Sequence, residues 1–128
     1  MLTGRCLCGQ VIYEIETSSV EATNCHCRQC QRSAGAAYIS WFTVPVSGFR
    51  YLTGEPVDFA SSSRGLRSFC GCCGTQLTFR SDDYPDEIDV TSCSLDHPEH
   101  VPPQSHTHVA SRISWVSVDD GLPVFDGG

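Results

Sequence analysis

The stretch Cys25-His26-Cys27-Arg28-Gln29-Cys30 carries three cysteines in close succession. Cys27 and Cys30 are three positions apart, which places them on one face of a helical turn, with Cys25 at its entry. Asn24 can cap a short helix that runs from Cys25 to Ala34, and Gly35 is placed to close it. We therefore expect three thiol groups to converge on one point, at the one segment whose pattern indicates a helix.

Two further cysteine groups flank this stretch in the sequence, Cys6-Leu7-Cys8-Gly9 and Phe69-Cys70-Gly71-Cys72-Cys73-Gly74. Two cysteines separated by one residue pair poorly as a disulfide but can bind one metal ion from a turn. The group at residues 69–74 contains a C-x-x-C-G turn, whose glycines let backbone amides approach the sulfurs. The total of nine cysteines, an odd number without a recognisable secretory signal, also favours metal binding over disulfides.

The spacing suggests how these cysteines divide between two metal ions. A closed tetrahedral site takes two ligands from each flanking group, namely Cys6, Cys8, Cys70 and Cys73. The central group supplies only three ligands, Cys25, Cys27 and Cys30, and leaves one coordination position open, as catalytic zinc sites do. Thiolate ligands favour zinc over magnesium, calcium or manganese. We expect two zinc ions per chain, one structural and one catalytic.

Alternatives to this division stay open at the level of the sequence. A fourth ligand from His26, Cys93 or another histidine would close the central site and make it structural. Cys93 is expected in a strand, where a single cysteine is typically a small core residue. Cys72 is an alternative to Cys73 as the second ligand from the group at residues 69–74. We favour Cys73 because a glycine follows it. Cys72 is then a free thiol or a packed residue.

Outside the cysteine groups, the sequence predicts short strands separated by turns. Val11, Tyr13 and Ile15 alternate with Ile12, Glu14 and Glu16, the period of a strand with one buried face. The expected strands are residues 11–15, 37–44, 49–52, 57–60, 66–69, 76–80, 88–92 and 113–118. This pattern predicts an all-β fold of antiparallel sheets, either two packed sheets or a distorted barrel, with one short helical turn.

Length and charge restrict the remaining possibilities. The chain has 128 residues, which predicts a single domain over residues 1–128. Eight arginines, no lysines and fifteen acidic residues give a formal net charge of −7, which disfavours nucleic acid as a partner. No apolar run approaches the ~20 residues of a membrane helix. We expect no membrane partner and a cytoplasmic location.

The cysteine groups and their surroundings resemble the glutathione-dependent formaldehyde-activating enzyme (GFA) family, also called the centromere-protein-V-like domain. The matching positions are residues 4–9, 25–30, Ser33, Gly35, 67–75, His106, Ser111, Arg112, Trp115, 120–123 and Phe125. The resemblance implies a β-tent-like fold of antiparallel sheets. It also implies a structural zinc on Cys6, Cys8, Cys70 and Cys73, and a catalytic zinc on Cys25, Cys27 and Cys30.

The activity implied by the resemblance is that of a carbon–sulfur lyase, which forms or cleaves S-hydroxymethylglutathione from formaldehyde and glutathione. The expected partner is therefore a small thiol, which the zinc at the central cysteines would convert to a thiolate for attack on a carbonyl. His26 and Arg28 stand beside this group and are candidates to steer an anionic ligand. Two other hypotheses are a non-enzymatic zinc-binding interaction module and a redox-labile zinc site.

Four histidines gather in a proline-rich stretch near the end of the chain: His97, His100, His106 and His108. We expect His97 and His100 to be solvated loop residues. His106 is distinguished from them by the family resemblance alone.

Overall fold

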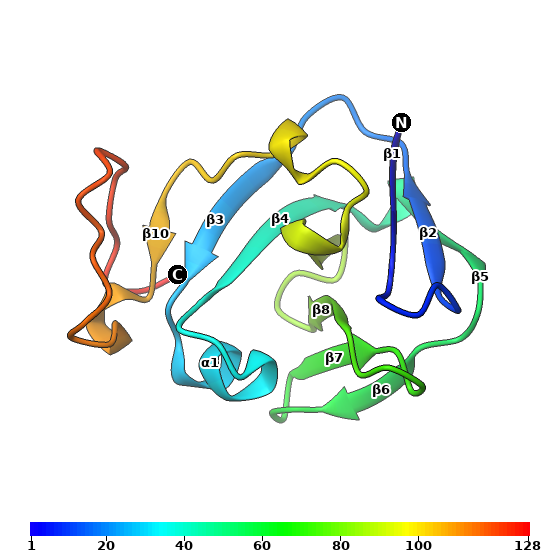
Figure 1. The fold of residues 1–128 in the computed structure, drawn as a ribbon, viewed down its shortest axis with the longest axis horizontal. Coiled ribbons are helices and arrows are strands. Elements are labelled where there is room, and N and C mark those ends of the chain that lie inside the picture. Colours follow the sequence, from blue (N-terminus) through cyan, green and yellow to red (C-terminus); the bar gives the residue numbers. More distant parts are fainter.

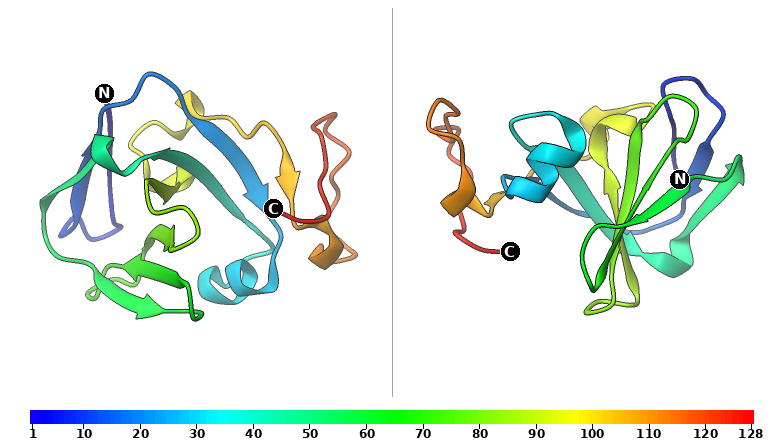
Figure 2. Two further views of the ribbon diagram at one scale, coloured as in Figure 1. Left: turned by 180° about the vertical axis from the view of Figure 1, so that it is seen from behind. Right: turned by 90° about the horizontal axis from the view of Figure 1, so that it is seen from below.

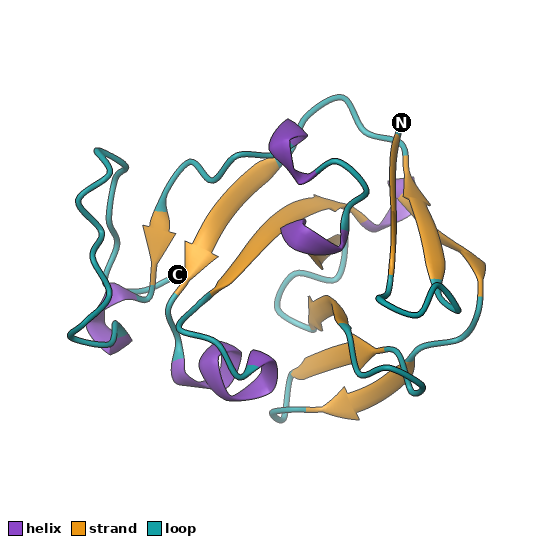
Figure 3. Cartoon of the chain, in the orientation of Figure 1, coloured by secondary structure: helices purple, strands orange, loops and turns teal.

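The computed structural model describes residues 1–128 and contains two β-sheets and one α-helix (Figures 1 and 3). The smaller sheet has the order β1-β2-β5, formed by β1 (Leu2–Arg5), β2 (Ile12–Ile15) and β5 (Phe49–Thr53). The larger sheet has the order β10-β3-β4-β9-β8-β7-β6. Its strands are β3 (Glu21–Cys25), β4 (Ile39–Pro45), β6 (Val57–Ala60), β7 (Gly65–Phe69), β8 (Gln76–Ser81), β9 (Glu87–Thr91) and β10 (His106–Thr107).

Helical structure is limited to short segments. The α-helix α1 (Arg28–Ala34) follows β3 and ends at Gly35, whose φ of 60° is left-handed and suits glycine. Single 3₁₀ turns occupy Val46–Gly48, Ser92–Ser94, Pro98–His100 and Val109–Ser111. None of these helices has the length and apolar character needed to cross a lipid bilayer.

The smaller sheet and the C-terminal segment lie at opposite ends of the molecule (Figures 1 and 2). The main core lies where the two sheets meet, and Tyr13, Ile15, Phe42 and Val90 are fully buried in it. Because side chains alternate along a strand, the neighbours of these core residues in β4 and β9 point to the opposite face of the larger sheet. That second face carries the candidate site.

Most of the expected architecture is confirmed. Antiparallel pairing dominates, and the expected strands from residue 11 to residue 92 are all present with small shifts at their ends. The exception to antiparallel pairing is β10, which pairs with β3 in parallel. The helical turn at the central cysteines is also present, as α1.

The strand expected at residues 113–118 is wrong, since this segment is irregular. The Arg112 guanidinium donates hydrogen bonds to the carbonyl oxygens of Ile113, Ser114 and Val116. The chain therefore curls around its own arginine instead of joining a sheet edge. Trp115 is left exposed, so nothing on this segment drives strand pairing through burial.

The expected helix cap is also wrong. Asn24 lies within β3, where its side-chain oxygen accepts a hydrogen bond from the Ser40 hydroxyl at 2.6 Å. The cap is Cys27, whose sulfur accepts a hydrogen bond from the Cys30 amide at 3.3 Å. Strand pairing with β4 and β10 extends β3 to Cys25, so the helix begins later than the sequence predicts.

Candidate metal centres

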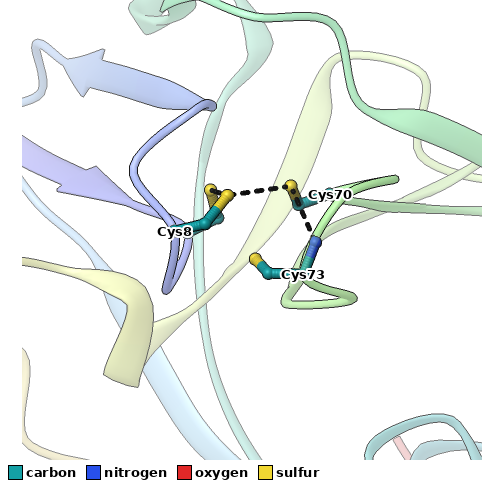
Figure 4. Close-up of side chains that lie close together, drawn as sticks. Cys8, Cys70 and Cys73 are labelled. Atoms are coloured by element: carbon teal, nitrogen blue, oxygen red, sulfur yellow. Dashed lines mark hydrogen bonds between the residues drawn. The ribbon is translucent and has the colours of Figure 1, made fainter.

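Four cysteines from two distant loops form the first cluster. Cys6 and Cys8 follow β1, whereas Cys70 and Cys73 follow β7, and all four sulfurs lie within 4.8 Å of one another. The sulfur–sulfur distance is 3.6 Å from Cys6 to Cys8 and 3.8 Å from Cys8 to Cys70. Figure 4 shows Cys8 and Cys70 with their sulfurs facing each other, with Cys73 beside them. A tetrahedral zinc site with bonds of about 2.3 Å has sulfur–sulfur edges of about 3.8 Å. The donor set fits zinc.

Backbone amides point at these sulfurs, as the glycine-containing turns predict. The Val11 amide donates to Cys6 Sγ at 3.2 Å, and the Cys73 amide donates to Cys70 Sγ at 3.5 Å. Gly74 turns the second loop with a φ of 79°. A hydrogen bond with the Thr75 hydroxyl lowers the pKa of Cys73 to about 5. These donors stabilise negatively charged sulfur, the form that binds metal.

Three cysteines form the second cluster, at the junction between β3 and α1. Cys25 ends β3, Cys27 caps α1, and Cys30 lies in its first turn. Their sulfurs lie within 4.8 Å of one another, and Cys25 and Cys30 are 3.6 Å apart. Cys25 and Cys30 are buried, and Cys27 is half-buried. No histidine, carboxylate or further cysteine joins this group.

The protonation of the second cluster is uneven. Contact with the Cys27 sulfur raises the pKa of Cys25, and contact with the Cys25 sulfur lowers the pKa of Cys27. The physical cause is that adjacent sulfurs cannot all carry negative charge without a counterion. A thiophilic cation is such a counterion, because it replaces the shared protons with its own positive charge. The chemistry of this donor set therefore also fits zinc.

A cavity of about 290 Å³ opens beside the second cluster on the outer face of the larger sheet. Cys25, Cys27 and Cys30 form one wall, and the strand residues Trp41, Thr43, Arg67, Phe79 and Asp89 form others. His108 and Gly128 also line it. The second cluster is thus accessible to a small molecule.

Arg67 is the cation next to the second cluster. Its side chain is buried, with 6% exposed, and its guanidinium lies 5.1 Å from the centre of the Phe79 ring. Nη2 donates to Cys30 Sγ at 3.6 Å, Nη1 donates to Ser33 Oγ at 3.2 Å, and Nε has no partner in the protein. Arg67 therefore places its positive charge against the Cys30 sulfur, and its buried Nε is left without a partner.

A chain of hydrogen bonds begins at His26, between Cys25 and Cys27 in the sequence, and runs to the C-terminal segment. His26 Nε2 and His106 Nδ1 are 3.0 Å apart, and His106 Nε2 and Asp120 Oδ2 are 2.7 Å apart. His26 is fully buried, and that burial lowers its pKa. The chain ties β3 to β10 and to the C-terminal segment. His26 is therefore a structural neighbour of the cluster and not one of its members.

The other cysteines and histidines lie outside both clusters. Cys93 is exposed in a 3₁₀ turn after β9, so the expectation of a core residue within a strand is wrong. Cys72 is exposed, and Cys73 occupies the position in the first cluster, as the following glycine predicts. His97 and His100 are exposed, as expected. Arg28 is exposed and donates to Gln31 Oε1 at 2.6 Å.

The sequence matches the family model described as "Glutathione-dependent formaldehyde-activating enzyme" over residues 1–111. The chain belongs to this family. The match includes every residue of both clusters, and it extends through Arg67 and Asp89. Family membership associates the chain with glutathione-dependent formaldehyde activation.

A solved structure supports the fold independently. The chain resembles the crystal structure of a Rhodobacter sphaeroides protein, with a TM-score of 0.64 and 20% sequence identity. The alignment covers 96% of this chain and 98% of the other. The similarity therefore concerns the whole fold. Among the curated proteins compared, none matches the sequence.

No function was expected for two of the cavity residues, Arg67 and Asp89, although Arg67 lies within the matching positions 67–75. Asp89 stands between the buried residues Ile88 and Val90, so strand alternation alone places it on the face opposite the core. Arg67 lies in β7 beside exposed Leu66. For Asp89, a charged residue flanked by apolar ones in a strand was the available signal, whereas Arg67 is followed by Ser68 and gave no such signal. The fold decides which strands are neighbours. It therefore also decides which charged residues line the same cavity.

Proposed function

We propose that this protein is a zinc-dependent carbon–sulfur lyase that joins or releases a small thiol and formaldehyde or a similar carbonyl. The proposal rests on the difference in the number of sulfur ligands between the two clusters. The first cluster has four sulfurs, whereas the second has three and borders a cavity. Closed four-ligand zinc sites are structural, and three-ligand sites keep a position for substrate.

In this proposal, the first cluster holds the structural zinc and the second holds the catalytic one. Cys25, Cys27 and Cys30 would hold this zinc, which would favour the thiolate form of a substrate thiol. Three thiolate ligands already donate strongly to the metal, which suits thiol exchange better than activation of water.

Around the second cluster, the residues of the chain orient and stabilise the reactants. The Arg67 guanidinium contacts Cys30 and lines the cavity, so its positive charge can stabilise negative charge on a substrate sulfur or oxygen. The Trp41 and Phe79 rings line the same cavity and exclude water from part of it.

The proposed reaction conserves atoms and electrons. The thiol sulfur uses a lone pair to form a bond to the carbonyl carbon, and the C=O π electrons move to oxygen. The proton lost by the thiol is balanced by the proton gained at this oxygen, which gives a hydroxymethyl thioether. The reverse sequence releases the carbonyl and the thiol. Glutathione is the thiol that the family description suggests.

The alternative of a non-enzymatic zinc module depends on a fourth protein ligand that closes the second site. His26 is engaged with His106, and Cys93 is exposed outside the cluster. Neither of the two named candidates is therefore in place, which favours an open site.

The test compares wild type with the Cys27→Ser variant. Cys27 is half-buried at the cavity, so serine is tolerated by the fold but removes one of three sulfur donors. We expect exchange between glutathione and its hydroxymethyl adduct, followed by NMR, to fall to the uncatalysed rate with an unchanged circular dichroism spectrum. Full exchange activity in the folded variant would contradict the proposed function.

A further inference from the structure

Asp89 is a carboxyl group in the cavity without a cationic partner. One of its oxygens accepts a hydrogen bond from the Thr43 hydroxyl at 2.5 Å, and no salt bridge in the protein includes Asp89. Burial raises the pKa of Asp89, which reflects the cost of holding an uncompensated charge there. A carboxylate in such a place is normally neutralised by a bound cation or an ion pair.

The strand register explains why Arg67 does not neutralise Asp89. Arg67 pairs with Phe79, and Phe79 pairs with Asp89, so the three residues form one row across β7, β8 and β9. Neighbouring strands are about 4.8 Å apart, so the backbones of Arg67 and Asp89 are separated by about 10 Å. The guanidinium lies over the intervening Phe79 ring and contacts Cys30. Arg67 and Asp89 therefore line the same cavity without forming an ion pair with each other.

Asp89 is also remote from the second cluster. Cys25 pairs with Ile39, and Asp89 pairs with Thr43, which is four residues further along β4. At about 3.4 Å per residue, this offset is about 14 Å along the strand. The Asp89 side chain is too short to span this offset, unlike the longer Arg67 side chain from the same row, so its carboxyl cannot exchange a proton directly with atoms bonded to a sulfur at the cluster. It is well placed to contact the other end of an extended thiol in the same cavity.

We propose that Asp89 determines specificity by binding an ammonium group at the end of the substrate remote from its thiol. The inference rests on the proposed function, because it takes the second cluster as the thiol site. The substrate class is then an extended, peptide-like thiol with a free amine, and not a short thiol such as 2-mercaptoethanol. Arg67 interacts with the sulfur end and Asp89 with the amine end.

The test uses Asp89→Asn, which keeps an acceptor for Thr43 and removes the charge. The probes are glutathione and glutaryl-cysteinyl-glycine, the same molecule without its amino group. We expect the KM of the variant for glutathione to rise by about 10- to 100-fold, the range of a hydrogen bond to a charged group. The kcat for glutathione and the KM for the glutaryl analogue should be unchanged.

The matched control is Asp86→Asn, which neutralises an exposed carboxylate in the turn before β9 and should change neither KM. An equal rise in KM for both thiols, or no rise for either, would overturn the role of Asp89. Calorimetric binding of both thiols to the zinc-loaded proteins separates this inference from the proposed function. Loss of the preference for glutathione in Asp89→Asn supports the inference even if the wild type lacks turnover, and an unchanged preference contradicts it.

Discussion

The two cysteine clusters use the same ligand chemistry in different surroundings. In the first cluster, Cys6 and Cys70 are buried in the main core, so four sulfurs join two loops at the centre of the fold. In the second cluster, three sulfurs lie at the end of a strand and the start of a helix, beside a cavity. The comparison teaches that donor number and access, and not ligand type, distinguish the two clusters, and the proposed structural and catalytic roles rest on that difference.

The largest effect, a loss of folding stability, is expected when one ligand of the first cluster is removed. Structural zinc contributes on the order of 10 kcal/mol to the folding of small domains, which is comparable to the whole stability of a domain. We therefore expect Cys73→Ser to be unfolded at room temperature, as judged by circular dichroism. Cys72→Ser changes the adjacent, exposed cysteine and should fold and melt like wild type. A folded Cys73→Ser protein would contradict the proposed structural role of the first cluster.

A smaller effect, on activity rather than folding, is expected at Arg67. Replacement by glutamine removes the positive charge that contacts Cys30. Loss of one preorganised electrostatic group typically costs about 100-fold in kcat. We expect a loss of this order in the NMR exchange assay, whereas Arg28→Gln, at an exposed position next to the cluster, should retain activity. Equal rates for the two variants would show that the charge beside Cys30 is not used.

The smallest effect concerns the support behind the second cluster. His106→Ala leaves buried His26 without its hydrogen-bond partner and detaches Asp120. An unsatisfied buried polar group costs about 1–3 kcal/mol, so the variant should lose that much stability in urea titration. His97→Ala, at an exposed position, is the control. Equal stability of the two variants would show that the hydrogen-bond chain contributes little.

The sequence predicts the two cysteine clusters better than it predicts their surroundings. Grouping of the cysteines depends on local spacing and on glycines such as Gly74, which are visible in the sequence. The cavity depends on the register of β7, β8 and β9, which brings together residues that are not neighbours in the chain. Arg67 and Asp89 received no role for that reason.

The errors in secondary structure have the same physical origin. The strand expected at residues 113–118 has good β-propensity, but its carbonyls are taken by Arg112. Conversely, β3 carries the polar residues Glu21, Thr23 and Asn24, and its place in the sheet comes from pairing with β4 and β10. In both cases a tertiary contact outweighs local propensity.

The most direct test of two unequal metal sites is zinc X-ray absorption on the purified protein, with and without saturating glutathione. The account predicts about two zincs per chain and an average of between three and four sulfur ligands, rising to about four when the thiol binds. A single zinc per chain would contradict it. So would an average of four sulfurs before thiol is added, because the second site would then already be closed.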